Sequence, residues 1–163
     1  MPDDKILENK KILVVDDEKD VLDTIEELLP MCKIKKALSF EEGNKFLETD
    51  FFDIAILDIM GVDGYRLLEI ANGKNIPAAM LTANALSPEN TVKSFKEGAA
   101  YYIPKEKMND IITYLTDIFD AIEKGKSFWE RWLDRFANYY DDKFGENWKD
   151  KDGDFWDNFP NYI

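Results

Sequence analysis

Five polar side chains follow closely on short apolar runs of this chain, and together they could hold a cation and accept a charged group. They are Asp16, Asp17, Asp58, Thr82 and Lys105. Three carboxylates that converge cannot all stay ionised without a countercharge, so such a cluster either takes up protons or holds a hard cation with oxygen ligands, for which Mg²⁺ is the natural candidate. A carboxylate can also act as a nucleophile that yields an acyl phosphate, while a lysine and a hydroxyl stabilise the oxygens of the transferred group. These residue types indicate phosphoryl chemistry, provided that the fold brings them together.

The composition excludes several other kinds of chemistry. Histidine is absent, which rules out Ser-His and Cys-His nucleophile pairs, histidine zinc ligands and a phosphohistidine on this chain. The formal net charge is −13, and no segment concentrates lysine and arginine at a spacing that could follow a phosphate backbone, so we expect no direct binding to nucleic acid or to an anionic membrane. The single cysteine, Cys32, cannot form an intramolecular disulfide, and neither a signal-peptide pattern nor an apolar run of about 18 residues is present. We therefore expect a cytoplasmic protein.

Short apolar runs alternate with amphipathic helical patterns from residue 11 to about residue 119, which is typical of repeated βα units around a parallel sheet. The predicted strands cover residues 12–16, 34–38, 54–58, 78–82 and 100–103. The second run is mixed with lysine, so we expect it at an edge of the sheet. With right-handed crossovers, the predicted fold is α/β, a doubly wound five-stranded parallel sheet of the flavodoxin-like order 2-1-3-4-5 with a C-terminal helical extension. The five polar residues then meet at the carboxyl edge of the sheet, where open α/β sheets bind ligands.

The chain divides into three predicted parts. Residues 1–10 are an N-terminal arm, residues 11–123 form the α/β domain, and residues 124–163 form an aromatic-rich helical extension that contains all four tryptophans. Within the domain, a serine at position 39 with a glutamate at position 42 predicts a capping box, and a serine followed by a proline at positions 87 and 88 predicts another helix start.

An aromatic stripe runs along one face of the predicted extension. Gly125 and Ser127 predict the end of one helix and the cap of the next, which we expect over residues 127–143. The side chains that share one face of this helix are Trp129, Trp132, Leu133, Phe136 and Tyr140. Large aromatic rings are poorly accommodated in water. We therefore expect the helix to dock beside the fifth helix of the domain, in its own chain or in a dimer partner. The alternative is a disordered segment that orders only when it binds a target.

Four segments of the chain resemble those of response regulator receiver domains, over about residues 10–122. They read KKILVVDDEKDVL, IAILDIMGVDGYRLL, AAMLTANA and EGAAYYIPK. The resemblance implies a receiver that is phosphorylated on Asp58, with Mg²⁺ or Mn²⁺ as cofactor. It further implies that Asp17 binds the cation directly, that Asp16 binds it through water, and that the carbonyl of Met60 is a third protein ligand. The loop DIMGVDG is shorter than is usual in the family, and its two glycines permit the tighter turn.

The resemblance also assigns the remaining site residues and the partners. Thr82 and Tyr102 match the switch pair of the family, a hydroxyl that moves toward the phosphoryl group and a ring that turns inward behind it. Lys105 matches the lysine that pairs with the phosphoryl group or with the free carboxylate. The implied partners are a sensor histidine kinase or phosphotransfer protein, a downstream protein target and, as a further state, a homodimer. Output by protein contact is expected through the surface of the fourth helix, fifth strand and fifth helix of the domain.

Two other functions are compatible with parts of the pattern. A degenerate receiver would act as a phosphorylation-independent interaction module, and its mark would be the loss of Asp58, Asp17 or Lys105, all of which are present. A metal-dependent phosphohydrolase would want an acidic residue two positions after its nucleophile, where this chain has Met60. We therefore expect no enzyme beyond Mg²⁺-dependent self-phosphorylation from small donors and slow loss of the chain's own phosphoryl group.

Overall fold

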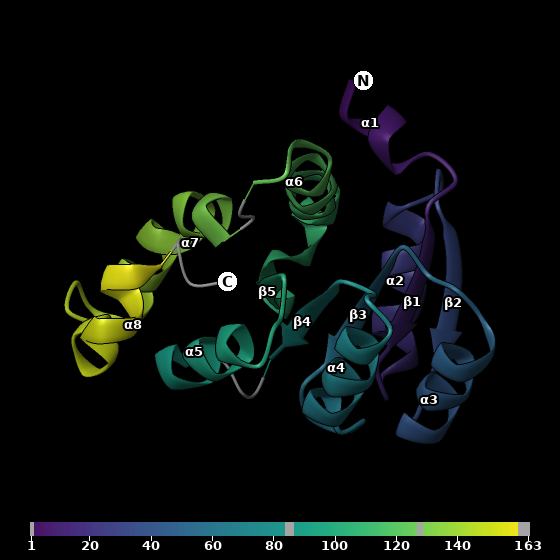
Figure 1. Ribbon diagram of the computed structural model, residues 1–163, viewed down its shortest axis with the longest axis horizontal. Helices are drawn as coiled ribbons and strands as arrows, with labels where there is room; N and C mark the ends of the chain where they lie inside the picture. The colour runs from purple at the N-terminus through teal and green to yellow at the C-terminus, as the bar shows by residue number, and fades with distance from the viewer. Residues whose placement is uncertain (1, 84–86, 127–128, 160–163) are drawn as a thin grey trace.

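A parallel sheet forms the centre of the computed structural model, which describes residues 2–83, 87–126 and 129–159. In these residues five strands are ordered β2-β1-β3-β4-β5 (Figure 1). They are β1 Lys11–Val15, β2 Lys33–Ala37, β3 Ile54–Asp58, β4 Ala78–Thr82 and β5 Tyr101–Pro104. The predicted fold and strand order are confirmed, and each strand lies within one residue of its predicted range. The lysine-bearing β2 lies at one edge, as expected, and β5 forms the other.

Helices cover both faces of the sheet. They are α2 Lys19–Leu28, α3 Phe40–Thr49, α4 Gly64–Gly73, α5 Pro88–Lys96 and α6 Ile111–Lys124, which follows the short 3-10 helix η1 Lys105–Asp110. Helices α2 and α6 pack together on one face, while α3, α4 and α5 line the other, as right-handed crossovers on either side of β1 require. Both predicted cap serines begin helices: Ser39 Oγ accepts a hydrogen bond from the Glu42 N–H at 3.2 Å, and Ser87 Oγ accepts one from the Asn90 N–H at 3.0 Å.

The N-terminal segment, predicted as an arm, packs against the body of the protein. Helix α1, Pro2–Leu7, contacts α6, and the side chain of Leu7 is fully buried (Figure 1). The Cys32 thiol donates a hydrogen bond to the Leu7 carbonyl at 3.3 Å. This segment therefore contributes to the core, which its short and charged sequence did not indicate.

The C-terminal extension is helical, as predicted. Helix α7, Trp129–Phe144, is followed by the 3-10 helix η2, Asp150–Asp152, and by α8, Gly153–Asn158 (Figure 1). Gly125 ends α6 with φ +66°, in the left-handed region that favours glycine. The predicted cap at residue 127 lies outside the described residues. The aromatic stripe of α7 docks on its own chain, against α5, β5 and α6.

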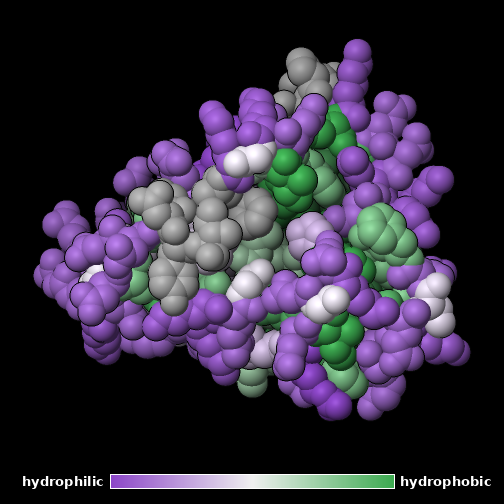
Figure 2. Space-filling model, in the orientation of Figure 1, coloured by the Kyte–Doolittle hydropathy of each residue, from purple (hydrophilic) through white to green (hydrophobic). Residues whose placement is uncertain are grey.

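The core is one contiguous apolar cluster that continues from the sheet into the rings of α7 and α8. The face of the molecule in Figure 2 is mainly hydrophilic, and apolar residues appear on it in separate patches. Among the described residues, no helix has both the length and the apolar character needed to cross a membrane.

Candidate functional site

A cavity of about 160 Å³ opens at the carboxyl edge of the sheet. It is lined by Asp17, Glu18, Asp58, Met60, Gly61, Thr82, Ala83 and Lys105. Asp16 lies beside it, fully buried directly after β1. The predicted polar residues are thus brought together where parallel strands present ligand sites. Tyr102, on the neighbouring strand β5, does not line the cavity.

The ammonium group of Lys105 joins three carboxylates. Its Nζ lies 2.9 Å from Asp16 Oδ2, 2.9 Å from Glu18 Oε1 and 3.4 Å from Asp58 Oδ1. Burial lowers the pKa of Lys105, but hydrogen bonds and charges from these carboxylates outweigh burial, so the pKa is raised. Lys105 is therefore a fixed positive charge at the site. It holds this place because β5 ends at Pro104 and the chain turns directly into η1.

Asp58 is the last residue of β3 and is 5% exposed. Burial is the largest cause that raises the pKa of its carboxyl group to about 7; the charge of Asp16 adds to the shift, and Lys105 opposes it. Burial likewise raises the pKa of Asp16, whose Oδ1 accepts a hydrogen bond from the Glu18 N–H at 2.8 Å. The two acids carry more negative charge than Lys105 alone neutralises, so a second cation would favour their ionised forms.

Three neighbouring carboxylates offer oxygen ligands to such a cation. Oxygen atoms of Asp16, Asp17 and Glu18 all lie within 4.8 Å of one another. Asp16 Oδ2 is buried and lies 2.9 Å from the Lys105 ammonium. Carboxylate oxygens are the ligands that hard divalent cations prefer. The residues present therefore fit Mg²⁺ or a similar ion.

The loop between β3 and α4 places glycines next to the acidic cluster, so the loop leaves room for the carboxylates. Gly61 has φ +81°, and a β-carbon there would lie 2.5 Å from Asp17 Oδ2. A β-carbon on Gly64 would lie 2.1 Å from the carbonyl oxygen of Asp58. Asp63, between them, precedes α4 in a left-handed conformation with φ +53°. The tight turn expected of the shortened loop is present, and glycine is required at both close approaches.

Thr82 lines the cavity, and Tyr102 lies close to it on the next strand, outside the lining. Thr82 is buried at the end of β4, and Tyr102 is fully buried on β5. Burial raises the pKa of Tyr102, while hydrogen bonds with Thr91, with the backbone of Ser87 and with Thr82 act in the opposite direction. The Tyr102 hydroxyl therefore points toward Thr82 and the start of α5, and away from solvent.

Two residues of this neighbourhood were not singled out from the sequence. Glu18 belongs to the acidic cluster and bonds the site lysine, and its position directly after Asp17 was the available signal. Thr91 approaches Tyr102 from α5, and no sequence pattern relates the two, because tertiary packing alone brings them together. Met60, a predicted backbone ligand, lines the cavity while its side chain is 58% exposed.

Comparisons with known proteins agree on one family. A model of the response regulator receiver domain matches residues 12–116. The two-component response regulator ARR18 of Arabidopsis thaliana is 32% identical over 108 residues, which cover 63% of this chain and 17% of ARR18. The transcriptional regulatory protein YvrH of Bacillus subtilis (strain 168) is 33% identical over 105 residues, which cover 61% of this chain and 44% of YvrH. This chain therefore matches less than half the length of either relative.

One solved structure resembles this chain over nearly the full length of the solved chain. The crystal structure of a CheY-like response regulator receiver domain protein from Methanospirillum hungatei JF-1 superposes with a TM-score of 0.65 at 31% sequence identity. The superposition covers 72% of this chain and 98% of that chain. The part of this chain that remains outside such matches includes the aromatic extension, because the family match ends at residue 116.

Proposed function

Because this chain belongs to the response regulator receiver domain family, we propose that it is the phosphoacceptor module of a two-component phosphorelay and that Asp58 accepts the phosphoryl group. Receiver domains are signalling switches. The observation that supports the assignment most is the position of Asp58: it is buried at a strand end, lines the cavity with the acidic residues, and lies 3.4 Å from Lys105 Nζ.

In the proposed reaction a carboxylate oxygen of Asp58 attacks phosphorus, and the bond between phosphorus and the donor breaks. The donor is the phosphohistidine of a sensor kinase or phosphotransfer protein, or a small acyl phosphate. The attacking carboxyl group must be ionised, so its pKa of about 7 makes the reaction sensitive to nearby positive charge. Lys105 supplies such a charge and can pair with the phosphoryl oxygens, and the Thr82 hydroxyl can donate a hydrogen bond to them.

We also propose a Mg²⁺ or Mn²⁺ site at the same edge of the sheet. Its ligands are oxygens of Asp16, Asp17 and Asp58 and the carbonyl of Met60, as the family resemblance implies. Glu18 joins this set because its carboxylate belongs to the same acidic cluster. When bound, the cation offsets the charge of the carboxylates and of the incoming phosphoryl oxygens. Gly61 keeps the space beside Asp17 open.

The proposed switch consists of Thr82 and Tyr102. When the Thr82 hydroxyl bonds to a phosphoryl group, its hydrogen bonding with Tyr102 changes, and Tyr102 lies against α5. A change of charge at Asp58 then reaches the surface formed by α5, β5 and α6. Residues 11–123 are the unit that performs this switch, and its output is contact with a downstream protein.

The test is phosphorylation by acetyl phosphate with Mg²⁺, followed by intact-mass measurement. We expect one added phosphoryl group on the wild-type chain, none on Asp58→Asn, and none after chelation of the metal. Asp63→Asn is the matched control, because Asp63 lies in the same loop but outside the acidic cluster, and asparagine tolerates its left-handed backbone. Labelling that persists in Asp58→Asn, or that ignores chelation, contradicts the assignment. An unlabelled wild-type chain would instead favour a phosphorylation-independent interaction module.

A further inference from the structure

Helix α7 covers the surface formed by α5, β5 and α6, which is the face through which the proposed switch would signal (Figure 1). Four of its rings are buried there: Trp129, Trp132, Phe136 and Tyr140. Trp132 contacts Phe95 of α5 with ring centroids 5.0 Å apart, and Phe136 contacts Tyr114 of α6 at 5.2 Å. The face is therefore occupied by a segment of the same chain.

Two indole groups attach α7 to the edge strand β5 and to the segment directly before it. Trp132 Nε1 donates a hydrogen bond to the Tyr102 carbonyl at 2.7 Å, and Trp129 Nε1 donates one to the Ala99 carbonyl at 2.9 Å. Backbone groups on the outer side of an edge strand otherwise lack a partner in the sheet. One of the two anchors is thus the backbone of a proposed switch residue.

Side-chain contacts also lead from α7, through Thr91 of α5, to Tyr102. The hydroxyls of Tyr140 and Thr91 lie 2.6 Å apart, and both side chains are fully buried. Thr91 Oγ1 donates to the Ser87 carbonyl at 2.7 Å, which leaves it able to accept from Tyr140. Thr91 and Thr82 both lie close enough to the Tyr102 hydroxyl to oppose the rise in its pKa that burial causes. Thr82, Tyr102, Thr91 and Tyr140 are all buried, so a contiguous group of side chains reaches from the rim of the cavity to α7.

An ion pair between half-exposed Arg135 and a buried carboxylate helps to fix where α7 docks. Asp117 of α6 is buried, and Arg135 of α7 bonds its two oxygens at 3.0 Å and 3.1 Å. The Tyr101 hydroxyl donates to the same carboxylate at 2.9 Å. Two of the three donors come from Arg135, and this paired geometry favours the position of α7 that aligns Trp132 and Tyr140 with Tyr102.

We propose that α7 is a ligand that this chain carries for its own switch face, and that docking of α7 and phosphorylation of Asp58 stabilise each other. The proposal rests on the proposed function, because it takes Thr82 and Tyr102 as the switch. With α7 docked, Trp132 and Tyr140 occupy the outer side of the face, so the Tyr102 ring is held inward beside Thr82. The coupling is reciprocal: docking of α7 changes the affinity for a phosphoryl mimic at Asp58 by the same factor by which the mimic changes the docking equilibrium. A change that weakens docking therefore also weakens binding of the mimic. In the phosphorylated state, a partner would meet the outer surface of the extension.

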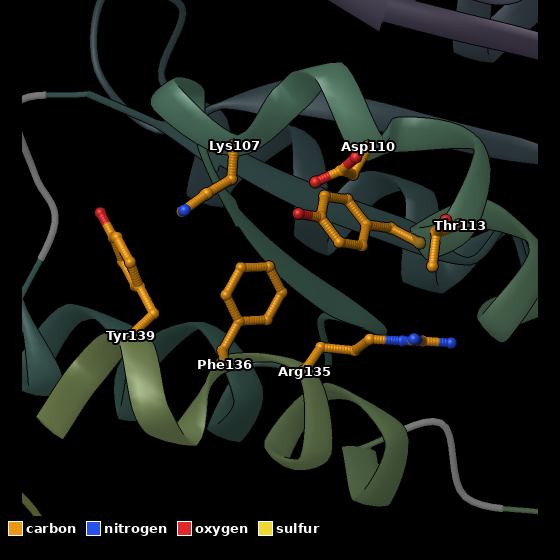
Figure 3. A pocket seen from close by; sticks show the side chains of 7 residues that line it. Lys107, Asp110, Thr113, Arg135, Phe136 and Tyr139 are labelled. Carbon is orange, nitrogen blue, oxygen red and sulfur yellow. The ribbon is translucent and has the colours of Figure 1, made fainter. Parts of the chain in front are cut away.

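The contact between α7 and the receiver body is less closely packed near η1. A cavity of about 270 Å³ lies there, lined by Lys107, Asp110, Thr113, Tyr114, Arg135, Phe136 and Tyr139. Figure 3 shows Arg135, Phe136 and Tyr139 rising from α7 toward Lys107 and Asp110 on the opposite side. The hydroxyl of Tyr139 bonds Glu106, an exposed residue. Tyr139 and Tyr140 are thus adjacent tyrosines of one helix, of which only Tyr140 faces Thr91.

The two adjacent tyrosines allow a test of the proposed coupling on the full chain. The affinity of beryllofluoride with Mg²⁺ is measured for wild type, Tyr140→Phe and Tyr139→Phe, and amide hydrogen exchange of α7 is followed with and without the mimic. We expect Tyr140→Phe to bind beryllofluoride about two- to tenfold more weakly, the effect of one lost hydrogen bond, and Tyr139→Phe to bind like wild type. Exchange in α7 should slow when the mimic binds to wild type.

A second variant keeps the test independent of one position. Trp132→Phe retains an aromatic ring but lacks the N–H that bonds the Tyr102 carbonyl, so we expect weaker binding of beryllofluoride here too. It replaces Tyr140→Phe if that variant does not fold. Equal affinities in wild type, Tyr140→Phe and Trp132→Phe overturn the proposal, as does tighter binding or faster exchange of α7 with the mimic, because α7 would then oppose phosphorylation. Failure of the wild-type chain to bind beryllofluoride overturns the proposed function itself, and this inference with it.

Discussion

Asp58 is an acid whose surroundings oppose its ionisation. Burial and the neighbouring Asp16 raise the pKa of its carboxyl group to about 7, and Lys105 only partly opposes them. In the metal-free protein, burial and Asp16 thus favour the protonated form of Asp58, which cannot attack phosphorus. A cation bound by the acidic cluster would lower this pKa, so metal binding and nucleophilicity rise together.

We predict that the free energy of unfolding of the metal-free protein falls as the pH rises from about 4 to about 7. The pKa of Asp58 is raised above its ordinary value of 3.8, so the folded state binds an extra proton in this window. The stability that this proton provides is complete below the lower pKa and is lost as the pH rises through the higher one. The shift corresponds to at most about 4 kcal/mol.

Urea unfolding in EDTA at several pH values measures this dependence, with Asp58→Asn as the comparison. The variant lacks the titrating group, so we expect a smaller fall in stability over the same window and a more stable protein than wild type at neutral pH. If both proteins lose stability equally, another group, such as Asp16, is responsible.

At the scale of an element, the turn between β3 and α4 decides whether the acidic cluster can form. Gly61 adopts φ +81° and has Asp17 Oδ2 where its β-carbon would be. The following helix begins directly after the left-handed Asp63. A short loop therefore positions both the end of β3 and the space beside Asp17, although neither glycine carries a functional group.

Gly61→Ala should displace the Asp17 carboxylate and weaken Mg²⁺ binding by about tenfold or more, because a residue that supports a ligand is lost. The left-handed backbone should also destabilise the fold by about 1–2 kcal/mol. Gly73→Ala is the matched control, since a β-carbon at this helical position meets no atom within 4 Å. Metal titration of both variants measures the difference. Equal Mg²⁺ affinities would mean that the loop adjusts without moving Asp17.

At the scale of the whole molecule, the receiver body and the extension share one core. The rings of α7 and α8 belong to the same apolar cluster as the sheet. Trp132 is fully buried and contacts rings of α5, α7 and α8. The extension should therefore unfold together with the body.

We predict that Trp132→Ala lowers the free energy of unfolding by about 3–5 kcal/mol, the range expected when a large buried ring is removed. Ile122→Ala, at a residue that is 48% exposed, should change it by less than about 1 kcal/mol. Urea unfolding followed by circular dichroism and by fluorescence of the remaining tryptophans should give one coincident transition. Two separate transitions, with the second as in wild type, would show that the extension unfolds independently.

The sequence by itself determined the sheet, its order and which strand-end residues meet at one edge. Apolar runs with a strand period, separated by runs with a helical period, define βα units, and right-handed crossovers leave few ways to arrange them. Residues at the ends of parallel strands meet at one edge whatever the details of packing. Asp58, Thr82 and Lys105 could therefore be placed together from their positions alone. The aromatic stripe likewise predicted a helix that docks, because periodicity is a local property.

Tertiary structure alone decided which groups touch across these elements. The bond between Glu18 and Lys105 joins residues 87 positions apart, and that between Thr91 and Tyr140 joins residues 49 apart. No local pattern encodes such pairs, since they depend on the angle and distance at which whole helices pack. The sequence predicted that α7 docks beside α6, whereas packing decided its contacts with α5 and β5. The stripe specifies an apolar face, and the buried carboxylate of Asp117 and the outward Tyr102 carbonyl of β5 determine where that face settles.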